Sequence, residues 1–292
     1  MRELQLAANG LRFRAIADGP EDGPLVLLLH GFPEGAASWA AQLPALAAAG
    51  LLAVAPDLRG YGGTDCPEGE DAYRMVHLVA DVAGLIDALG RDRCHLAGHD
   101  WGALVGWGVA SAHPDRLLTW SALSVGHPEA FTATIRDDPG QRERSSYIEL
   151  FRAPDHKAER VLAEDGHRRL RRMYAYGPAP DAIPPERVDE FVRAMARPGR
   201  LTAGLSYYRA NLGDGAEPMA PNPITTPSQL IWGDGDPAVG PAPTHATEPL
   251  VAGEYRLCAL PGAGHWLQFE RPDDVSRLLL EWIRTRRASR RG

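Results

Sequence analysis

Asp100 stands where a short acidic side chain can act as a nucleophile. It is the central residue of the segment GHDWG (98–102), which joins an apolar segment to one with helical spacing. The pattern Gly-x-nucleophile-x-Gly is typical of a sharp strand-to-helix turn that usually carries serine. Aspartate is ionised at neutral pH, and the N–H groups at the start of a helix stabilise its charge. It can therefore attack an sp³ carbon without a general base and form an alkyl ester.

Hydrolysis of such an ester needs a general base and an acidic group that orients it. His265, in the glycine-flanked loop GAGHW, is the candidate base. Asp236, at the end of the segment SQLIWGDGD, is the candidate acid. Asp234 lies two residues earlier and Glu129 follows another strand-like segment, so both remain alternatives for the acid.

The same reaction needs an oxyanion hole for the tetrahedral intermediate. The backbone N–H of Trp101, directly after the nucleophile, is one expected donor. The turn HGFP (30–33) follows an apolar segment and supplies the second, for which Phe32 is the candidate because Pro33 has no N–H. A cis peptide bond between Phe32 and Pro33 would aim the Phe32 N–H at the ester, and we expect one.

Strand-like and helix-like segments alternate in the first and last parts of the chain. The Asn9-Gly10 pair within 3–19 predicts a β-hairpin. Apolar runs predict buried strands over 25–31, 51–57, 94–100, 117–125, 228–236 and 254–262. Helical spacing predicts helices over 38–50, 73–90, 101–114 and 272–287. This alternation predicts a mostly parallel sheet with helices on both faces, and it brings the candidate residues to the carboxyl edge of the strands.

The alternation stops in the middle of the chain. Between 127 and 222 the sequence is mainly helical in character, and it ends in a proline-rich linker at 217–227. We therefore expect a core formed by 1–126 and 223–292 with a helical cap inserted at 127–222.

Composition narrows the classes of function. The chain has 292 residues, 44% of them hydrophobic, and a net charge of −7 without a basic stripe, which argues against nucleic-acid binding. It shows no signal-peptide pattern and no apolar run long enough to span a membrane. The three cysteines predict reduced thiols and a cytoplasmic location. The histidines lack metal-ligand spacing, so we expect no metal, and we expect no cofactor. We expect a monomer or a homodimer.

Four motifs in order carry a resemblance to a known family. HGFPE, GHDWGA, WGDGD and GAGHW resemble the Asp-nucleophile branch of the α/β-hydrolase superfamily, which holds the soluble epoxide hydrolases and the haloalkane dehalogenases. The resemblance covers nearly the whole chain. It implies the α/β-hydrolase fold with a helical cap, and a covalent ester on Asp100 hydrolysed by His265 with Asp236.

The leaving group separates the two enzyme classes. An epoxide oxygen needs a proton from an acid that stays protonated at neutral pH, and tyrosine meets this condition. Tyr147, in SYIELFRAPD, resembles the tyrosine of the first cap motif of epoxide hydrolases, although Arg152 and Asp155 depart from its Gln and Gly. Tyr208, in SYYRAN, resembles that of the second motif, in which Tyr207 replaces the usual Trp.

These residues predict an epoxide hydrolase that acts on a small-molecule epoxide. A haloalkane dehalogenase is the first alternative, since the Trp101 indole is suited to hold a halide; Phe32 stands where that group often has Asn. A non-catalytic ligand-binding protein is the second. Asp100 as a simple helix cap, and the two tyrosines as ordinary aromatic residues of cap helices, are the corresponding structural interpretations.

Overall fold

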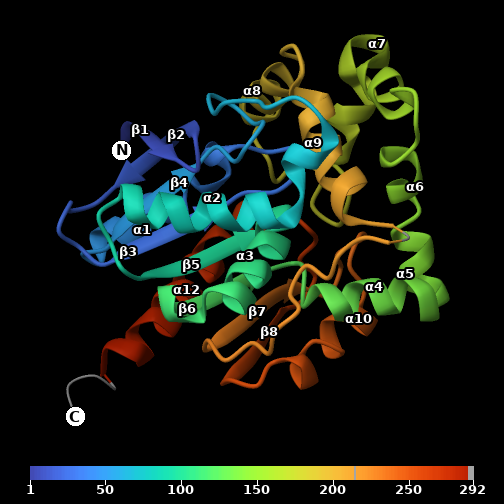
Figure 1. The fold of residues 1–292 in the computed structure, drawn as a ribbon. Helices are drawn as coiled ribbons and strands as arrows, with labels where there is room; N and C mark the ends of the chain where they lie inside the picture. Colours follow the sequence, from blue (N-terminus) through green and yellow to red (C-terminus); the bar gives the residue numbers. More distant parts are fainter. Residues whose placement is uncertain (214, 289–292) are drawn as a thin grey trace.

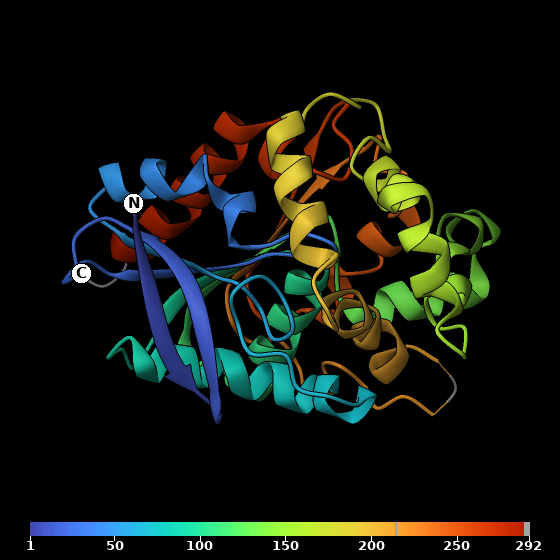
Figure 2. The ribbon, with the colours of Figure 1, turned by 90° about the horizontal axis from the view of Figure 1, so that it is seen from above.

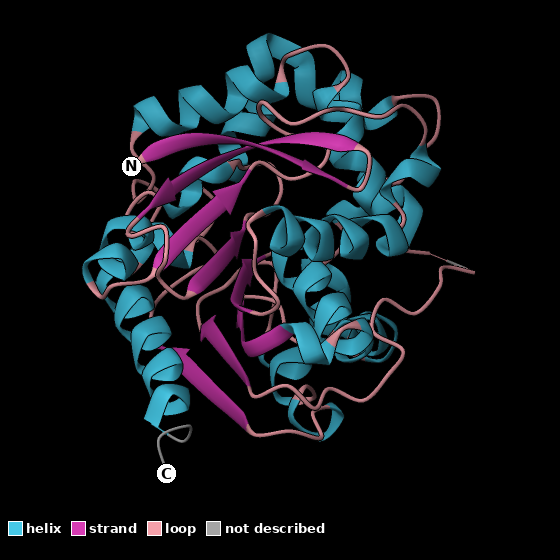
Figure 3. Ribbon diagram, turned by 60° about the vertical axis from the view of Figure 1, so that its left-hand side comes forward, coloured by secondary structure: helices cyan, strands magenta, loops and turns pink. Residues whose placement is uncertain are grey.

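The centre of the molecule is one twisted sheet. The computed structural model describes residues 1–213 and 215–288. Its eight-stranded sheet has the order β1-β2-β4-β3-β5-β6-β7-β8 (Figures 1 and 3). The strands are β1 Arg2–Ala8, β2 Leu11–Asp18, β3 Leu25–Leu29, β4 Leu52–Pro56, β5 Cys94–His99, β6 Leu117–Leu123, β7 Ser228–Gly233 and β8 Tyr255–Leu260. Pairing is antiparallel from β1 through β2 to β4 and parallel from β4 to β8.

The hairpin at the edge of the sheet follows from its turn residues. Asn9 and Gly10 have φ values of 46° and 74°, the positive pair that a two-residue hairpin turn requires. β1 and β2 pair along their whole length, from Arg2 with Ala17 to Ala8 with Leu11. The predicted hairpin is confirmed, and Figure 2 shows it on the side of the molecule away from α6 and α7.

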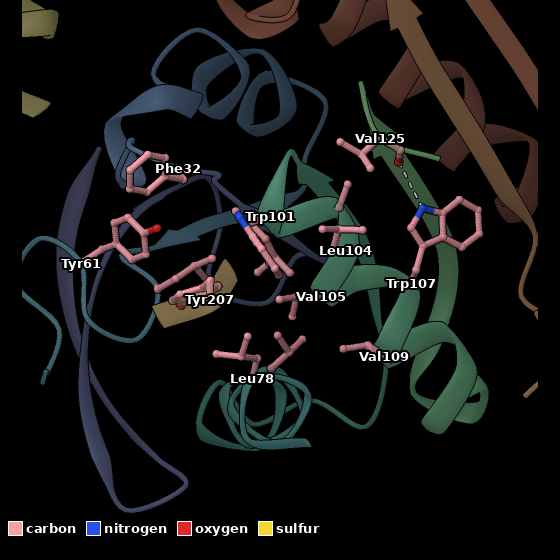
Figure 4. Close-up of a cluster of buried hydrophobic side chains, with 14 of the residues drawn as sticks. Phe32, Tyr61, Leu78, Trp101, Leu104, Val105, Trp107, Val109, Val125 and Tyr207 are labelled. Atoms are coloured by element: carbon pink, nitrogen blue, oxygen red, sulfur yellow. Dashed lines mark hydrogen bonds between the residues drawn. The ribbon is translucent and has the colours of Figure 1, made fainter. Parts of the chain in front are cut away.

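Helices cover both faces of the sheet and bury its two apolar surfaces. α1 (Gln42–Ala48) and α12 (Pro272–Ala288) contribute to the core on one face. α2 (Met75–Ala88) and α3 (Trp101–Ala112) contribute to the larger core on the other. Figure 4 shows part of that core around α3, where the indole N–H of Trp107 donates to the Val125 carbonyl at 3.2 Å.

Two predicted helices are shorter than their apolar pattern suggested. The segment 38–50 divides into a 3-10 helix, η1 (Ala36–Trp39), and α1. Pro44 has no N–H to donate to a preceding turn, so it is tolerated only in the first turn of an α-helix, and α1 accordingly begins just before it. The segment 73–90 likewise starts as η2 (Glu70–Tyr73), and Arg74, with ψ 147°, separates this turn from α2.

Helices fill the segment between β6 and β7. They are α4 Pro128–Asp137, α5 Pro139–Arg144, α6 Tyr147–Phe151, α7 Lys157–Met173, α8 Pro185–Met195 and α9 Arg200–Asn211 (Figure 1). α7 is kinked, with non-helical dihedral angles at 164–167. The chain then returns along α3, where the Asn222 N–H donates to the Ser111 hydroxyl at 2.8 Å.

Short elements complete the chain. They are η3 Pro114–Arg116, α10 Pro241–His245, η4 Glu248–Leu250 and α11 Leu267–Glu270. Among the described helices, none has both the length and the apolar composition that crossing a bilayer requires.

Candidate functional site

Asp100 lies at the carboxyl edge of the sheet, on the turn from β5 into α3. Its φ and ψ are 53° and −117°, a conformation that is costly for a residue with a side chain. The flanking glycines allow the turn because the backbone passes so close to them. A Cβ at Gly98 would lie 2.2 Å from the Gly102 carbonyl oxygen, and one at Gly102 would lie 2.3 Å from that of Leu29. The motif is therefore a requirement of the backbone geometry.

The Asp100 carboxylate faces the HGFP turn. Its Oδ1 accepts the Phe32 N–H at 2.8 Å, and its side chain makes no capping hydrogen bond to its own helix. The Phe32–Pro33 peptide bond is cis, as expected. A Cβ at Gly31 would lie 2.5 Å from Asp100 Oδ1, so only glycine lets the turn approach this closely. Asp100 therefore occupies the N-cap position of α3, but its side chain does not cap that helix.

His265 lies between two carboxylates. Its Nδ1 is 2.8 Å from Asp236 Oδ2, and its Nε2 is 3.7 Å from Asp100 Oδ2. The other Asp236 oxygen accepts the N–H groups of Ala238 and Val239 at 2.7 and 3.0 Å. These bonds fix the buried Asp236 carboxylate so that it orients the imidazole toward Asp100.

The two alternative acids lie elsewhere. Asp234 accepts the Gly262 N–H at 2.6 Å on the surface of the molecule. Glu129 is exposed at the start of α4, where its N–H donates to His127 Nδ1. Among these three carboxylates, Asp236 alone is hydrogen-bonded to His265 in the described residues.

The three groups shift one another's proton affinity. Burial disfavours a charged imidazole, but the charges of Asp236 and Asp100 and their hydrogen bonds outweigh this and raise the pKa of His265 well above its usual range. Burial would likewise raise the pKa of Asp100, but the hydrogen bond and charge of His265 outweigh it and lower that pKa. In the free protein the geometry therefore favours an ionised Asp100 beside an imidazolium.

Several residues that hold His265 carried no signal in the sequence. The Glu270 carboxylate accepts the N–H groups of Gly264 and Trp266, at 2.6 and 3.0 Å, and so brackets the histidine. The His265 carbonyl accepts the Ser124 hydroxyl at 2.8 Å.

A buried cluster below Asp100 holds the same loop and the HGFP turn. His99 Nε2 is 2.8 Å from the His265 carbonyl oxygen, and His99 Nδ1 is 2.9 Å from Glu34 Oε2. Glu34 also accepts the Gly31 N–H at 3.0 Å. The motif HGFPE contains Glu34 but did not indicate this role. The cluster therefore links the GHDWG turn, the HGFP turn and the loop that carries His265.

Tyr147 and Tyr208 meet above this site, although sixty-one positions separate them in the sequence (208 − 147). Tyr147 is the first residue of α6 and Tyr208 lies on α9; their ring centroids are 6.3 Å apart. Both line a cavity of about 360 Å³ together with Asp100 and His265. Burial, followed by the Asp100 charge, raises the pKa of each phenol, so both stay protonated at neutral pH.

Two of the three departures from the cap motifs, at Tyr207 and Asp155, have local explanations. The Tyr207 hydroxyl donates to the Arg59 carbonyl at 2.9 Å, and its ring packs edge-on against Trp101 at 5.5 Å (Figure 4). Asp155, where the motif has Gly, has a φ of 57°, which aspartate tolerates better than most residues. Arg209 donates two hydrogen bonds of 2.8 Å to Glu159 and so joins α9 to α7.

The Trp101 side chain takes part in the aromatic contacts rather than standing alone. It is 1% exposed and lies edge-on to Tyr208, with ring centroids 4.9 Å apart. Trp101 also hydrogen-bonds to Tyr208 and thereby limits the rise of that phenol's pKa. In the described part of the chain, no group of three or more His, Cys, Asp or Glu side chains is arranged to hold a metal ion.

Comparison with known proteins places the fold in a family. Residues 24–272 match the family described as alpha/beta hydrolase fold. The chain belongs to the α/β-hydrolase family. This hydrolase is 37% identical to Epoxide hydrolase A of Mycobacterium tuberculosis, over 96% of this chain and 97% of that protein.

Solved structures agree with this placement. Epoxide Hydrolase A from Mycobacterium thermoresistibile superimposes with a TM-score of 0.83 at 33% identity, covering 97% of this hydrolase and 98% of that chain. A variant of an epoxide hydrolase from Bacillus megaterium, crystallised with its naphthyloxy-propane-1,2-diol product, gives a TM-score of 0.87 at 27% identity, covering 96% and 100%. The predicted α/β-hydrolase fold is confirmed.

Proposed function

We propose that this hydrolase adds water to an epoxide and releases a vicinal diol. The observation that carries the proposal is the shared cavity, in which two protonated phenols, Tyr147 and Tyr208, accompany the Asp100 carboxylate. Relatives named epoxide hydrolase that align over nearly the whole chain support it.

In the first step, Asp100 attacks one carbon of the oxirane. The C–O bond of the ring breaks, and the departing oxygen takes a proton from Tyr147 or Tyr208. Each phenol donates a hydrogen bond that strengthens as charge develops on this oxygen, so each stabilises mainly the transition state. The product of the step is an ester between Asp100 and one carbon of the future diol.

In the second step, His265 removes a proton from water, and the resulting hydroxide attacks the ester carbonyl of Asp100. The N–H groups of Phe32 and Trp101 stabilise the tetrahedral oxyanion. Its collapse breaks the bond between the Asp100 carboxyl carbon and the alkyl oxygen, which takes the proton of the newly formed carboxyl group. The diol leaves with an oxygen from Asp100, and the solvent oxygen stays in the Asp100 carboxylate. Asp236 holds the imidazole and stabilises its positive charge.

Formation of the ester prepares the second step. The free protein surrounds His265 with two negative charges, and both raise the pKa of the imidazole. Esterification neutralises Asp100 and leaves Asp236 as the remaining partner. The pKa of His265 then falls, so the imidazolium gives up its proton, which restores the phenol that protonated the oxirane oxygen. Neutral His265 is thus available as a base only once the ester exists.

Two measurements test the proposal. Intact-mass analysis of His265→Ala after exposure to an epoxide should show one added substrate mass, located on Asp100 by peptide mapping, and no diol. A parallel incubation of the native hydrolase with 1-haloalkanes measures halide. Halide release without diol formation from any epoxide would replace this function with dehalogenation, and absence of both products would favour a binding protein.

We also propose how the protein is organised and where it acts. Residues 127–222 form a cap on a core made of 1–126 and 223–292. The run of helices from α4 to α9, between β6 and β7, supports this division of the chain. The free thiols of Cys66, Cys94 and Cys258 support a cytoplasmic location. We propose a monomer or homodimer, tested by light scattering in solution.

A further inference from the structure

The cavity above Asp100 combines an apolar body with a cationic mouth. Carbon-rich side chains form much of its wall, as they do in sites that bind small molecules. They include Phe32, Phe151, Leu162, Met173, Pro237 and Trp266. Three arginines also line it, namely Arg144 on α5 and Arg169 and Arg172 on α7. Besides Asp100, the only acidic residue among the described lining residues is Glu143.

Arg169 and Arg172 differ from their neighbours on the same helix. Arg168 pairs with Asp165, and Arg171 pairs with Asp189. Arg169 and Arg172 are exposed, and neither has an acidic partner within ion-pair distance among the described residues. Two guanidinium groups at the entrance are therefore free to bind an anion from outside the chain.

Arg144 adds a third positive charge with a different attachment. It donates to the Asp236 carbonyl at 2.9 Å, so it also contacts the loop of the proposed acid. The mouth thus carries more positive than negative charge in a protein whose net charge is −7. This local excess of positive charge lies on the exposed part of the cavity that contains Asp100.

The charge of the nucleophile decides where an anionic substituent can lie. A carboxylate or phosphate beside Asp100 would be repelled by it and would have to lose its hydration. At the mouth the same group stays hydrated and meets Arg169 and Arg172. The two ends of the cavity therefore orient an elongated molecule, with its uncharged oxirane inward and its anion outward.

We propose that this hydrolase prefers epoxides that carry an anionic group at the end opposite the oxirane, held at the mouth by Arg169 and Arg172. This inference rests on the proposed epoxide hydrolysis and names the substrate class of the same site. Tyr176, which is 64% exposed, also lines the cavity and adds aromatic surface to it.

A matched pair of substrates tests the preference. 4-(Glycidyloxy)benzoate and 4-(glycidyloxy)benzamide have nearly the same shape and differ in charge. We expect kcat/KM to be about fivefold to tenfold higher for the benzoate at low ionic strength, because two exposed arginines each contribute modestly. The ratio should fall toward one as salt screens the charges. Equal kcat/KM for both substrates at low salt would overturn the inference.

Variants assign the preference to its residues. Arg169→Gln/Arg172→Gln should remove the advantage of the benzoate and leave the benzamide unchanged. Arg168→Gln, on the same helix but outside the cavity, removes one positive charge, as each of the single variants Arg169→Gln and Arg172→Gln does, and should keep the preference. Arg169→Gln alone should have the larger single effect, because Arg172 also borders a second cavity that contains Asp181 and Asp189.

The outcomes separate this inference from the function on which it rests. Turnover of the benzamide without preference for the benzoate contradicts the anion site alone. Absence of diol from both substrates, with the protein folded by circular dichroism, contradicts the epoxide hydrolase proposal itself. Loss of the preference in Arg168→Gln as well would show that overall charge, rather than the mouth, attracts the anion.

Discussion

The two halves of the cavity are built in different ways. Its floor consists of Asp100 and His265, with the buried Asp236 hydrogen-bonded to His265. Backbone N–H groups of Phe32, Ala238 and Val239 hold the two carboxylates. Its roof, consisting of Tyr147 and Tyr208, lies on α6 and α9, and side chains fix α9 in place. The Arg209–Glu159 ion pair joins α9 to α7, and the Tyr207–Arg59 hydrogen bond joins α9 to the segment after β4.

This difference separates two demands of the chemistry. Ester hydrolysis requires a base and oxyanion donors at fixed positions, which a backbone frame supplies with little freedom. Ring opening requires phenols that can accommodate different substrates, and helices joined by side chains adjust more readily. Substitutions of His265 and Asp236 in the floor should therefore affect the second step, and substitutions in the roof the first.

The largest expected effect is in the floor. His265→Ala should reduce steady-state diol formation by about 10³- to 10⁴-fold, because ester hydrolysis loses its general base. Ester formation should continue, so that rapid quenching yields one labelled Asp100 per chain. His77→Ala, which removes an exposed histidine of α2, is the control. Steady turnover by His265→Ala would contradict the assignment of the floor.

The next effect is in the roof. Tyr147→Phe/Tyr208→Phe should slow ester formation by about 10³-fold, since the departing oxygen loses both donors. Single variants should lose less, because one phenol partly replaces the other. Hydrolysis of ester already formed should be nearly unchanged in a single-turnover chase. Tyr255→Phe is the control, because the Tyr255 hydroxyl has no hydrogen-bond partner among the described residues. Unchanged ring opening in the double variant would remove the tyrosines from the mechanism.

Titration sharpens the electrostatic description of the floor. Asp100→Asn should lower the pKa of His265 measured by imidazole NMR, because one of two negative charges disappears. A raised folded-state pKa stabilises the protein below the ordinary histidine pKa, and this stability is lost as pH rises through the folded value. Asp100→Asn should therefore lose less unfolding free energy than the native protein as pH rises from the ordinary histidine pKa through the folded-state pKa of His265. An unchanged His265 titration would show that Asp100 does not contribute.

A smaller effect is expected from the ties of the roof. Arg209 and Glu159 have side-chain exposures of 7% and 14%, so Arg209→Gln leaves a largely buried carboxylate without its cation. We expect a loss of about 2 to 4 kcal/mol in the free energy of unfolding and roughly tenfold slower ring opening. Arg209→Gln/Glu159→Gln should recover part of the stability, since no unpaired charge remains. If Arg209→Gln slowed ester hydrolysis more than ring opening, the division between floor and roof would be contradicted.

The smallest effect concerns the bracket around His265. Glu270→Gln keeps one acceptor oxygen but weakens the bonds from Gly264 and Trp266, which a carboxylate accepts more strongly. We expect ester hydrolysis to slow a few-fold, with ring opening unchanged, as read from burst kinetics. A slowed burst phase would indicate that Glu270 also supports the first step.

The contrast between floor and roof also explains what the sequence could predict. Asp100, Phe32 and His265 lie in motifs because the backbone there tolerates few residues, as the close approaches at Gly31, Gly98 and Gly102 show. The strands, the hairpin and the helical character of the middle of the chain followed from apolar periodicity and turn residues.

The supporting contacts could not be read in this way. Arg209 and Glu159 are 50 positions apart, and Tyr207 and Arg59 are 148 apart. No local pattern marks such pairs, because the tertiary fold alone brings them together. Glu270 resembled an ordinary acidic residue near a helix start for the same reason.

The inserted helices leave and rejoin the sheet domain at one place. Pro128 and Glu129, where α4 begins, line the same cleft as Asn211 and Leu212, where α9 ends. A segment with adjacent ends can be exchanged during evolution without disturbing the pairing of β6 with β7. Because the proposed proton donors belong to this segment, a recombination event at that cleft could convert the inherited ester chemistry to another leaving group in a single step.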